Sequence, residues 1–329
     1  MTGAFISWTP ENGRTAELAE ALGIPAHFIH RPGRFGLTGR YARQHAATRR
    51  LLQEQRPDTV VLMLPPAIAL LSLGRRRTAP RLIVDLHTGF FLDPKWRWAR
   101  GPALAAIRRR GGLAIVTNTH LQHECARAGV EAVVLHDVVQ DRDALPHTGE
   151  LLCPLSYAND EPVPEILAAA RLTPELRWTL TGRAPDAVRA AAPGNVRFTG
   201  FVAPEEFDRL TRSSGAVIAL TTRPHTMQRA GYEALHAGVP HVTSDFPELR
   251  EFYGDAAAYT APDGAAIAAA ARSVLQDRDL FAERTRLLRA QRRAEQRPVL
   301  VQLTAALAAA SPAHSGSAAP ADLMPKGAA

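Results

Sequence analysis

Short apolar segments alternate with helical patterns along most of the chain, and this alternation limits the possible folds more than any other feature. In the first half, the apolar segments are nearly uninterrupted, as expected for strands of a parallel sheet covered on both faces. They lie at Ala4–Trp8, His27–His30, Thr59–Leu64, Leu82–Leu86, Leu113–Thr117 and Ala132–His136. Helical patterns at Arg14–Leu22 and Tyr41–Gln55 separate some of them. This half is therefore predicted to be a doubly wound, Rossmann-like α/β domain.

The same alternation starts again after a polar segment with Pro and Gly, Asp141–Glu150, which is predicted to be a linker. Further strands are expected at Leu151–Leu155, Arg177–Thr181, Val196–Phe198, Ala216–Leu220 and His241–Thr243. Helices are expected at Val163–Arg171, Pro204–Arg212, Gln228–Ala237, Ala265–Gln276 and Leu280–Ala310. The second half is thus a second Rossmann-like unit.

The 329 residues are sufficient for two domains of ordinary size. We expect an N-terminal domain at 1–147, a C-terminal domain with closing helices at 148–310, and a disordered tail rich in Pro and Ala at 311–329. Two such domains leave a cleft that faces the carboxyl ends of both sheets, where ligands bind in this architecture.

The formal net charge of +7 is concentrated in two basic segments, Lys95–Arg110 and Arg284–Arg297. Neither segment lies in a recognisable nucleic-acid-binding module, and aromatic residues make up only 6% of the chain. We therefore expect no nucleic-acid partner. Lys95–Arg110 also contains Trp96 and Trp98, a combination suited to a membrane surface, so peripheral membrane contact or a lipid-linked acceptor stays open.

The two cysteines, Cys125 and Cys153, form no CxxC pair, which argues against a disulfide scaffold and a cysteine zinc site. The N-terminal segment lacks the pattern of a secretory signal. The most apolar stretch, Thr59–Gly74, is interrupted by Pro65-Pro66 and is shorter than the ~20 residues that span a bilayer. We expect a cytoplasmic protein, with peripheral contact to the inner membrane face as an alternative.

Common catalytic motifs are missing from the sequence. There is no GxGxxG fingerprint, no GxxxxGK[ST] phosphate loop, no HExxH zinc motif and no GxSxG nucleophile elbow. These absences argue against most NAD enzymes, kinases and hydrolases. We therefore expect no cofactor and no obligatory metal.

The segment Thr221–Arg250 has the pattern strand, loop, helix, turn, strand. The free N–H groups at the start of its helix would form an anion site, so we expect phosphates near Thr226, Met227 and Gln228, with Thr226 as a possible cap. Glu233 lies two turns after Thr226, about 10 Å along the helix, where its carboxylate could bind ribose hydroxyls. The pattern fits an extended nucleotide sugar.

This segment resembles the donor-binding helix of bacterial GT-B glycosyltransferases, particularly the family 4 (group 1) enzymes. The family pattern E-x7-E-(A)-x-x-x-G-x-P-V-x-x-(S/T)-D is matched here by the following residues: Glu233, Ala234, Gly238, Pro240, Ser244 and Asp245. The resemblance extends back through Asn195–Leu220 and Trp178–Pro185, and the N-terminal half matches in layout only. It implies a GT-B fold and transfer of a sugar from a nucleotide-diphosphate-sugar donor to an acceptor hydroxyl.

The sequence departs from the family pattern at two places. His225 occupies the position of the first glutamate, which in the family contacts the donor sugar, and an imidazole could make the same kind of contact. The basic pair that binds phosphate in the family has no equivalent in Leu151–Pro162, so Arg183, Arg223 or Arg229 would have to supply the charge.

Two residues of the first half are further candidates. His87 follows an apolar strand, and the resemblance implies a histidine there that contacts the donor sugar or helps deprotonate the acceptor hydroxyl. The alternative is a strand-end histidine bonded to a backbone carbonyl. Gly13 could let the backbone approach the donor phosphates, or could belong to an ordinary turn.

The sequence therefore predicts a glycosyltransferase with His87 and His225 as candidate catalytic residues. Two alternatives remain open, a sugar-nucleotide epimerase and a non-catalytic nucleotide- or glycan-binding relative of the same fold. The acceptor could be a glycan, a lipid-linked molecule or a natural product, and the sequence does not determine the oligomeric state.

Overall fold

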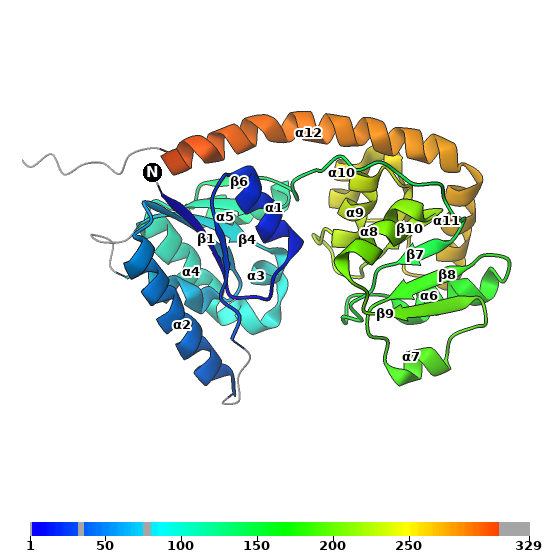
Figure 1. Ribbon diagram of the computed structural model, residues 1–329, viewed down its shortest axis with the longest axis horizontal. Coiled ribbons are helices and arrows are strands. Elements are labelled where there is room, and N and C mark those ends of the chain that lie inside the picture. Colours follow the sequence, from blue (N-terminus) through cyan, green and yellow to red (C-terminus); the bar gives the residue numbers. More distant parts are fainter. Residues whose placement is uncertain (1, 32–35, 75–79, 309–329) are drawn as a thin grey trace, which may run out of the picture.

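The computed structural model describes residues 2–31, 36–74 and 80–308, and shows two α/β domains side by side, each built on a six-stranded parallel sheet (Figure 1). The predicted fold class is confirmed. The predicted tail at 311–329 lies outside the described residues.

The first sheet has the strand order β2-β1-β3-β4-β5-β6. Its strands are β1 (Gly3–Ser7), β2 (Ala26–Phe28), β3 (Thr59–Leu64), β4 (Arg81–Leu86), β5 (Leu113–Val116) and β6 (Ala132–Val134). Its helices are α1 (Gly13–Ala21), α2 (Gly36–Gln55), α3 (Thr88–Leu92), α4 (Arg97–Arg109) and α5 (Thr119–Arg127), with short 3₁₀ turns η1 (Ala67–Leu73) and η3 (Pro94–Trp96). All six strands lie within two residues of the predicted segments, because continuous apolar runs mark buried parallel strands clearly.

The second sheet has the order β12-β11-β10-β7-β8-β9. Its strands are β7 (Leu151–Cys153), β8 (Trp178–Thr181), β9 (Val196–Gly200), β10 (Ala216–Ala219), β11 (His241–Ser244) and β12 (Ala257–Thr260). Its helices are α6 (Val163–Leu172), α7 (Asp186–Ala190), α8 (Pro204–Ser213), α9 (Arg229–Ala237), α10 (Pro247–Tyr253) and α11 (Gly264–Gln276), with a 3₁₀ turn η4 (Gly254–Ala256). The edge strand β12 was not predicted, because AAYT is short and carries little apolar signal.

In both sheets the chain reverses its direction of strand addition beside the first strand. β1 lies between β2 and β3, and β7 lies between β8 and β10. At such a switch point the loops that leave neighbouring strands separate, which opens a crevice at the carboxyl ends.

The last helix, α12 (Arg278–Ala308), runs along both domains (Figure 1). The sequence assigned it to the second domain, but Leu303 and Leu307 pack with Phe5 and Leu18 in the core of the first. Near its middle, the Gln296 side chain accepts a hydrogen bond from the backbone N–H of Val139 at 3.0 Å and donates one to the carbonyl of Asp137 at 2.7 Å. The helix therefore joins the second domain, the linker and the first domain.

Within the described ranges, no helix is long and apolar enough to cross a membrane. The longest one, α12, has 31 residues but contains repeated arginines. The second longest, α2, has 20 residues and is also rich in polar side chains.

Candidate active site

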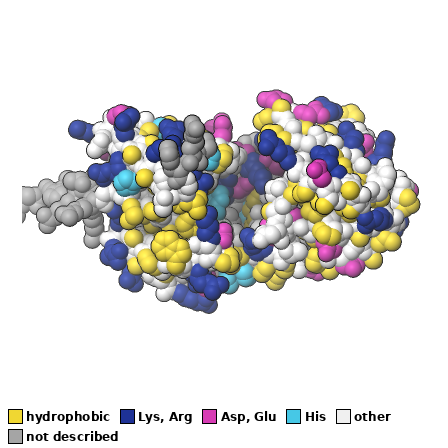
Figure 2. All heavy atoms as spheres, turned by 90° about the horizontal axis from the view of Figure 1, so that it is seen from below, with side chains coloured by type: hydrophobic (Ala, Val, Ile, Leu, Met, Phe, Trp, Pro, Cys, Tyr) yellow, Lys and Arg dark blue, Asp and Glu magenta, His cyan; other side chains and the backbone are white. Residues whose placement is uncertain are grey.

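A cavity of about 560 Å³ lies between the two domains, and both of them line it. The space-filling view shows the hollow between the two lobes, with acidic, basic and histidine side chains inside it (Figure 2). The lining residues are Thr9, Pro10, Glu11, Asn12, Gly13, Arg14, Met63, His87, Thr88, Gly89, Thr117, Asp137, Thr226, Met227, Arg229 and Tyr232. The predicted candidates Gly13, His87, Thr226, Met227 and Arg229 are thus brought to one cavity.

The floor of the cavity is held by a buried ion-pair network in the first domain. Arg14, in the first turn of α1, donates from Nη2 to Asp85 Oδ1 at 2.7 Å and from Nη1 to Asp137 Oδ1 at 2.9 Å. Burial alone would raise the pKa of both carboxyls. Arg14, together with His87 at Asp85 and Arg229 at Asp137, more than offsets this effect, so both pKa values lie below the ordinary value. Asp85 and Asp137 are therefore carboxylates at neutral pH.

His87 lies at the end of β4 beside this network. Its Nε2 is 2.9 Å from Asp85 Oδ2. Because Asp85 is ionised, Nε2 carries the proton of this hydrogen bond, and in the neutral ring Nδ1 is left with a free lone pair. The expected alternative, a bond from the ring to a backbone carbonyl, is replaced by a bond to a carboxylate. The side chain is 31% exposed and faces the cavity.

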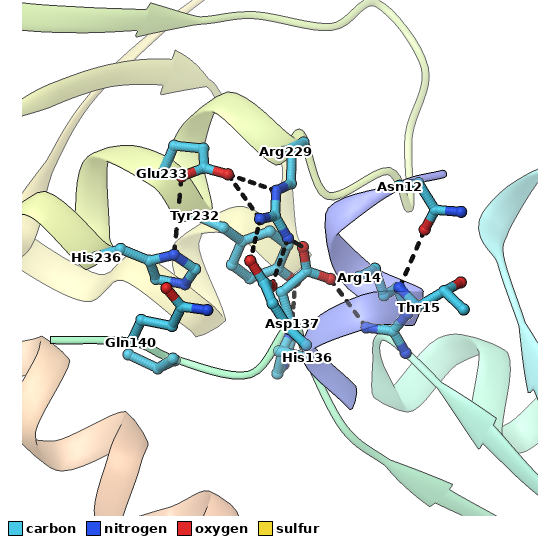
Figure 3. A network of polar contacts seen from close by, with 12 residues as sticks. Asn12, Arg14, Thr15, His136, Asp137, Gln140, Arg229, Tyr232, Glu233 and His236 are labelled. Carbon is cyan, nitrogen blue, oxygen red and sulfur yellow. Dashed lines mark hydrogen bonds and ion pairs between the residues drawn. The ribbon is translucent and has the colours of Figure 1, made fainter. Parts of the chain in front are cut away.

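Arg229 contributes the second centre of charge, from the first residue of α9 (Figure 3). Its guanidinium is 2.6 Å from Glu17 Oε1 of α1, 2.6 Å from Asp137 Oδ2 and 2.6 Å from Glu233 Oε1 of its own helix. Burial raises the pKa of Glu17 even though Arg229 lowers it, so this carboxyl is less acidic than usual. One arginine of the second domain thus holds two acids of the first.

Gly13 permits this contact. A Cβ atom at Gly13 would lie 2.6 Å from Nη2 of Arg229, closer than two such atoms can approach. The sequence interpretation expected this glycine to make room for donor phosphates. In the structure it makes room for the guanidinium that forms the ion pairs between the domains.

Glu233 is buried, with 9% of its surface exposed, and does not itself line the cavity. Its carboxylate is held by Arg229 and by Arg142 of the linker, whose Nη1 lies 3.2 Å from Oε2. The side chain points toward the charge network and not into bulk water (Figure 3). It therefore lies next to the cavity, and an ion pair connects it to Arg229, which lines the cavity.

The start of α9 faces the cavity through Thr226, Met227 and Arg229. The residue that precedes the helix is Gln228, and its side chain makes no capping bond. Its amide instead donates to the Leu220 carbonyl at 3.0 Å. Thr226 is too early to cap the helix, and its hydroxyl bonds to the Pro224 carbonyl.

His225 lies where the domains touch, outside the lining of the cavity. Its ring stacks on His120 of the first domain, with centroids 3.8 Å apart and an interplanar angle of 3°, and its Nδ1 bonds to Glu248. Its carbonyl accepts hydrogen bonds from Asn118 at 3.2 Å and from Thr88 at 3.4 Å. His225 adopts a left-handed backbone conformation, with a φ of 58°.

The other two candidate arginines do not reach the cavity. Arg183 is exposed and lies over the ring of Phe201, 5.9 Å from its centroid. Arg223 donates to the side chain of Asn159 at 3.3 Å. Of the three arginines considered for phosphate binding, only Arg229 lines the cavity.

Sequence reasoning missed Arg14, Glu17, Asp85 and Asp137. One signal was available, because Asp85 interrupts an otherwise apolar strand and a buried carboxylate requires a partner. Nothing in the sequence indicates that Asp137 would meet arginines from both domains.

Comparisons with known proteins agree with this geometry. The family model described as glycosyl transferases group 1 matches residues 159–277. Over this segment, which is less than half of the chain, the sequence is similar to group 1 glycosyltransferases. The arrangement of two Rossmann-like domains is that of the GT-B fold. A search of curated protein sequences finds no match.

Several solved structures share the whole two-domain arrangement. Sucrose-phosphate synthase from Thermosynechococcus elongatus superposes with a TM-score of 0.75 at 12% identity, covering 93% of this chain and 98% of that one. HepE from Anabaena, in complex with UDP-glucose, has a TM-score of 0.67 at 17% identity, covering 94% and 98%. A putative UDP-N-acetylglucosamine 2-epimerase from Listeria monocytogenes has a TM-score of 0.62 at 14% identity, covering 87% and 90%. At these identities the likeness shows the fold.

Proposed function

We propose that this protein transfers a sugar from a nucleotide-diphosphate-sugar donor to an acceptor hydroxyl. The observation that carries the proposal is the cavity between the domains, where the start of α9 and the Asp85–His87 pair face the same space. The group 1 domain match over residues 159–277 and the UDP-glucose complex of HepE support a nucleotide sugar as the donor.

In this proposal, His87 is the general base. Its Nδ1 takes the proton of the acceptor hydroxyl while the acceptor oxygen forms a bond to the anomeric carbon and the bond from that carbon to the diphosphate breaks. Asp85 holds the tautomer with the proton on Nε2 and stabilises the imidazolium that results. The nucleoside diphosphate leaves with the electron pair of the broken bond.

The leaving diphosphate needs positive charge, which we assign to Arg229 and to the N–H groups at the start of α9. Arg229 is already paired with three carboxylates. The diphosphate must therefore replace at least one of them. Asp137 and Glu233 are each also held by a second arginine, so we assign Glu17 as the carboxylate that gives way. Glu233 then positions the ribose, and His225 aligns the loop before α9. We propose that the diphosphate is stabilised by these groups without an obligatory metal.

A thermal-shift panel tests the donor class directly. UDP-, GDP-, ADP- and dTDP-sugars are added in turn, and one nucleotide series is expected to raise the melting temperature because a ligand of the folded state stabilises it. No shift with any member contradicts the proposal.

Analysis of products formed from the donor alone separates transfer from epimerisation, since an epimerase needs no acceptor. Retention of activity after treatment with EDTA tests the metal-free mechanism.

We further propose that the protein works in the cytoplasm and contacts the membrane peripherally through α4. Two apolar side chains of α4 and of the neighbouring η1 are exposed, Trp98 at 72% and Leu71 at 69% of their surface. The arginines of α4 suit an anionic headgroup layer. Sedimentation with vesicles containing 30% anionic lipid is expected to retain the wild type and release Trp98→Ser. Equal recovery of both proteins contradicts this contact.

A further inference from the structure

A second, smaller pocket of about 220 Å³ opens next to the candidate active site, on the first domain. It is lined by Trp8, Thr9, Pro10, His30, Arg40, Tyr41, Pro65, Pro66, Lys95 and Trp96. These residues come from α2 and from segments that follow β1, β2, β3 and β4. Thr9 and Pro10 line both cavities, so a molecule in the second pocket lies beside the proposed reaction centre.

The floor of this pocket is aromatic and rigid. Trp8 and Tyr41 are stacked with centroids 6.1 Å apart, and Trp8 and Trp96 are 4% and 7% exposed. The Trp8 indole N–H donates to Thr48 at 2.8 Å. Gln44 of α2 donates to the carbonyls of Trp8 and Ile29, at 2.8 and 2.7 Å, which ties α2 to the ends of β1 and β2. Such a floor suits a flat or apolar part of a ligand.

The charged groups around this floor are basic. Among the described residues that line the pocket, none is acidic, while Arg40, Lys95 and His30 are present. The Arg40 guanidinium lies over the Tyr41 ring at 5.0 Å and bonds to its hydroxyl at 3.4 Å, and its buried Nε has no hydrogen-bond partner among the described residues. Lys95 Nζ lies 5.3 Å from the centroid of the Trp96 ring.

The contrast with the first cavity indicates what the pocket binds. There, Arg14 and Arg229 are each held by carboxylates of the protein. Here, the cations lie on aromatic rings, and the nearby Asp93 is engaged by the backbone N–H of Lys95 at 2.9 Å. A partly buried guanidinium that forms no ion pair with a carboxylate among the described residues, in a pocket that a lysine also lines, is a site for a phosphate or carboxylate, because an anion would satisfy the buried N–H and both charges.

We propose that this pocket is the acceptor subsite and that it selects an acceptor carrying an anionic group, a phosphate in particular. This inference rests on the proposed glycosyltransferase function. Arg40 and Lys95 bind the phosphate, the aromatic floor contacts the body of the acceptor, and the hydroxyl that receives the sugar points past Thr9 and Pro10 toward His87. The phosphate can come from a soluble sugar phosphate or from a lipid-linked phosphate.

Saturation-transfer NMR on the full chain, saturated with UDP, tests the subsite with glucose 6-phosphate as the probe and glucose as the neutral comparison. The phosphate probe is expected to give a signal at least fivefold stronger than glucose. Arg40→Gln and Lys95→Gln should each reduce that signal severalfold. Arg50→Gln, an exposed arginine on the same helix, should leave it unchanged. Melting curves check that each variant is folded.

A second arm replaces the soluble probe by phosphatidylcholine vesicles with or without a polyprenyl phosphate. Binding that depends on Arg40 in either arm supports the subsite, and the arm that responds identifies the source of the phosphate. Equal signals from glucose and glucose 6-phosphate, together with vesicle binding that does not depend on Arg40, overturn it. If UDP and UDP-sugars still stabilise the protein in that case, the proposed function stands and only the subsite fails.

Discussion

The two halves of the cleft are supported in different ways. On the first-domain side, Asp85 contacts both Arg14 and His87, and all three residues belong to the first domain. On the second-domain side, Arg229 and the carbonyl of His225 find most of their partners on the opposite domain. The contacts that hold the first-domain side therefore lie within that domain. Most of the contacts that hold the second-domain side require the two domains to be in contact.

This difference separates two tasks. A general base must be oriented at all times for proton transfer, and a buried network in one domain provides that orientation. A donor site must admit and release a charged ligand, and ion pairs that break when the domains part allow this exchange. The following predictions test the distinction, from the largest expected effect to the smallest.

His87→Ala should have the largest effect on the rate. Loss of a general base lowers turnover by about 10²–10⁴-fold, while the affinity for the nucleotide should stay within a factor of two of the wild type. Transfer assays and calorimetry measure the two quantities. His123→Ala, an exposed histidine on α5, is the matched control. A rate loss below tenfold would remove His87 from the role of base.

Asp85→Asn should have the largest effect on stability. The change leaves the buried Arg14 with one of its two carboxylates, and breaking a buried pair costs about 3 kcal/mol in the free energy of unfolding. Chemical denaturation measures this loss. Asp279→Asn, which changes a fully exposed carboxylate at the start of α12 that lies 3.7 Å from Arg278, should change stability by less than ~0.5 kcal/mol. Equal losses in the two variants would show that the first half is not self-supporting.

Low pH should destabilise the first-domain side of the cleft by protonating its buried carboxylates. The pKa values of Asp85 and Asp137 are lowered in the folded state, so their contribution is fully present above the unfolded value of about 4 and is lost as the pH falls below it. The pKa of Glu17 is raised in the folded state, so protonation of this carboxyl as the pH falls favours the folded state. Denaturation between pH 6 and pH 3 should show a steep loss for the wild type and a shallower one for Asp85→Asn. Parallel curves would contradict the assignment.

Glu233→Ala should weaken nucleotide binding about tenfold, or ~1.4 kcal/mol. The variant releases Arg229 and Arg142 from a shared carboxylate, through which Glu233 is proposed to position the nucleotide. Calorimetry with the nucleotide measures the change, and Glu131→Ala, an exposed residue before β6, provides the comparison. Unchanged affinity in Glu233→Ala would remove this carboxylate from the donor site.

His225→Ala should have the smallest effect. It removes the ring that stacks on His120 and the bond to Glu248, but keeps the carbonyl that bonds to the first domain. Turnover is expected to fall severalfold, with less change in nucleotide affinity. If both quantities fall equally, His225 acts on donor binding and not on the alignment of the closed cleft.

Much of the fold was predictable because it depends on patterns that are local in the sequence. Thr59–Leu64 is a strand with the predicted bounds, since five consecutive apolar residues after Thr59, bounded by Asp58 and Pro65, leave little ambiguity. The turn after α9 was equally clear, with Gly238 in the left-handed conformation that ends the helix.

The site was less predictable because its partners are distant in the chain. Gly13 and Arg229 are more than two hundred residues apart, and their contact depends on the relative position of two domains. The path of α12 was missed for a similar reason. Its pattern shows an apolar face around Leu303 and Leu307, but does not indicate which core receives that face.

The hydrogen bonds of Gln296 have a mechanical consequence. The chain crosses between the domains twice, in the linker and in α12, and Gln296 of α12 bonds to Asp137 and Val139 just before the linker begins. Pro298 lies two residues further on and leaves one backbone hydrogen bond of the helix unmade, which makes bending easiest there. A rotation of one domain against the other is therefore expected to pivot near Asp137, the carboxylate that Arg14 and Arg229 share, and to change the width of the cavity more than the contacts at the pivot.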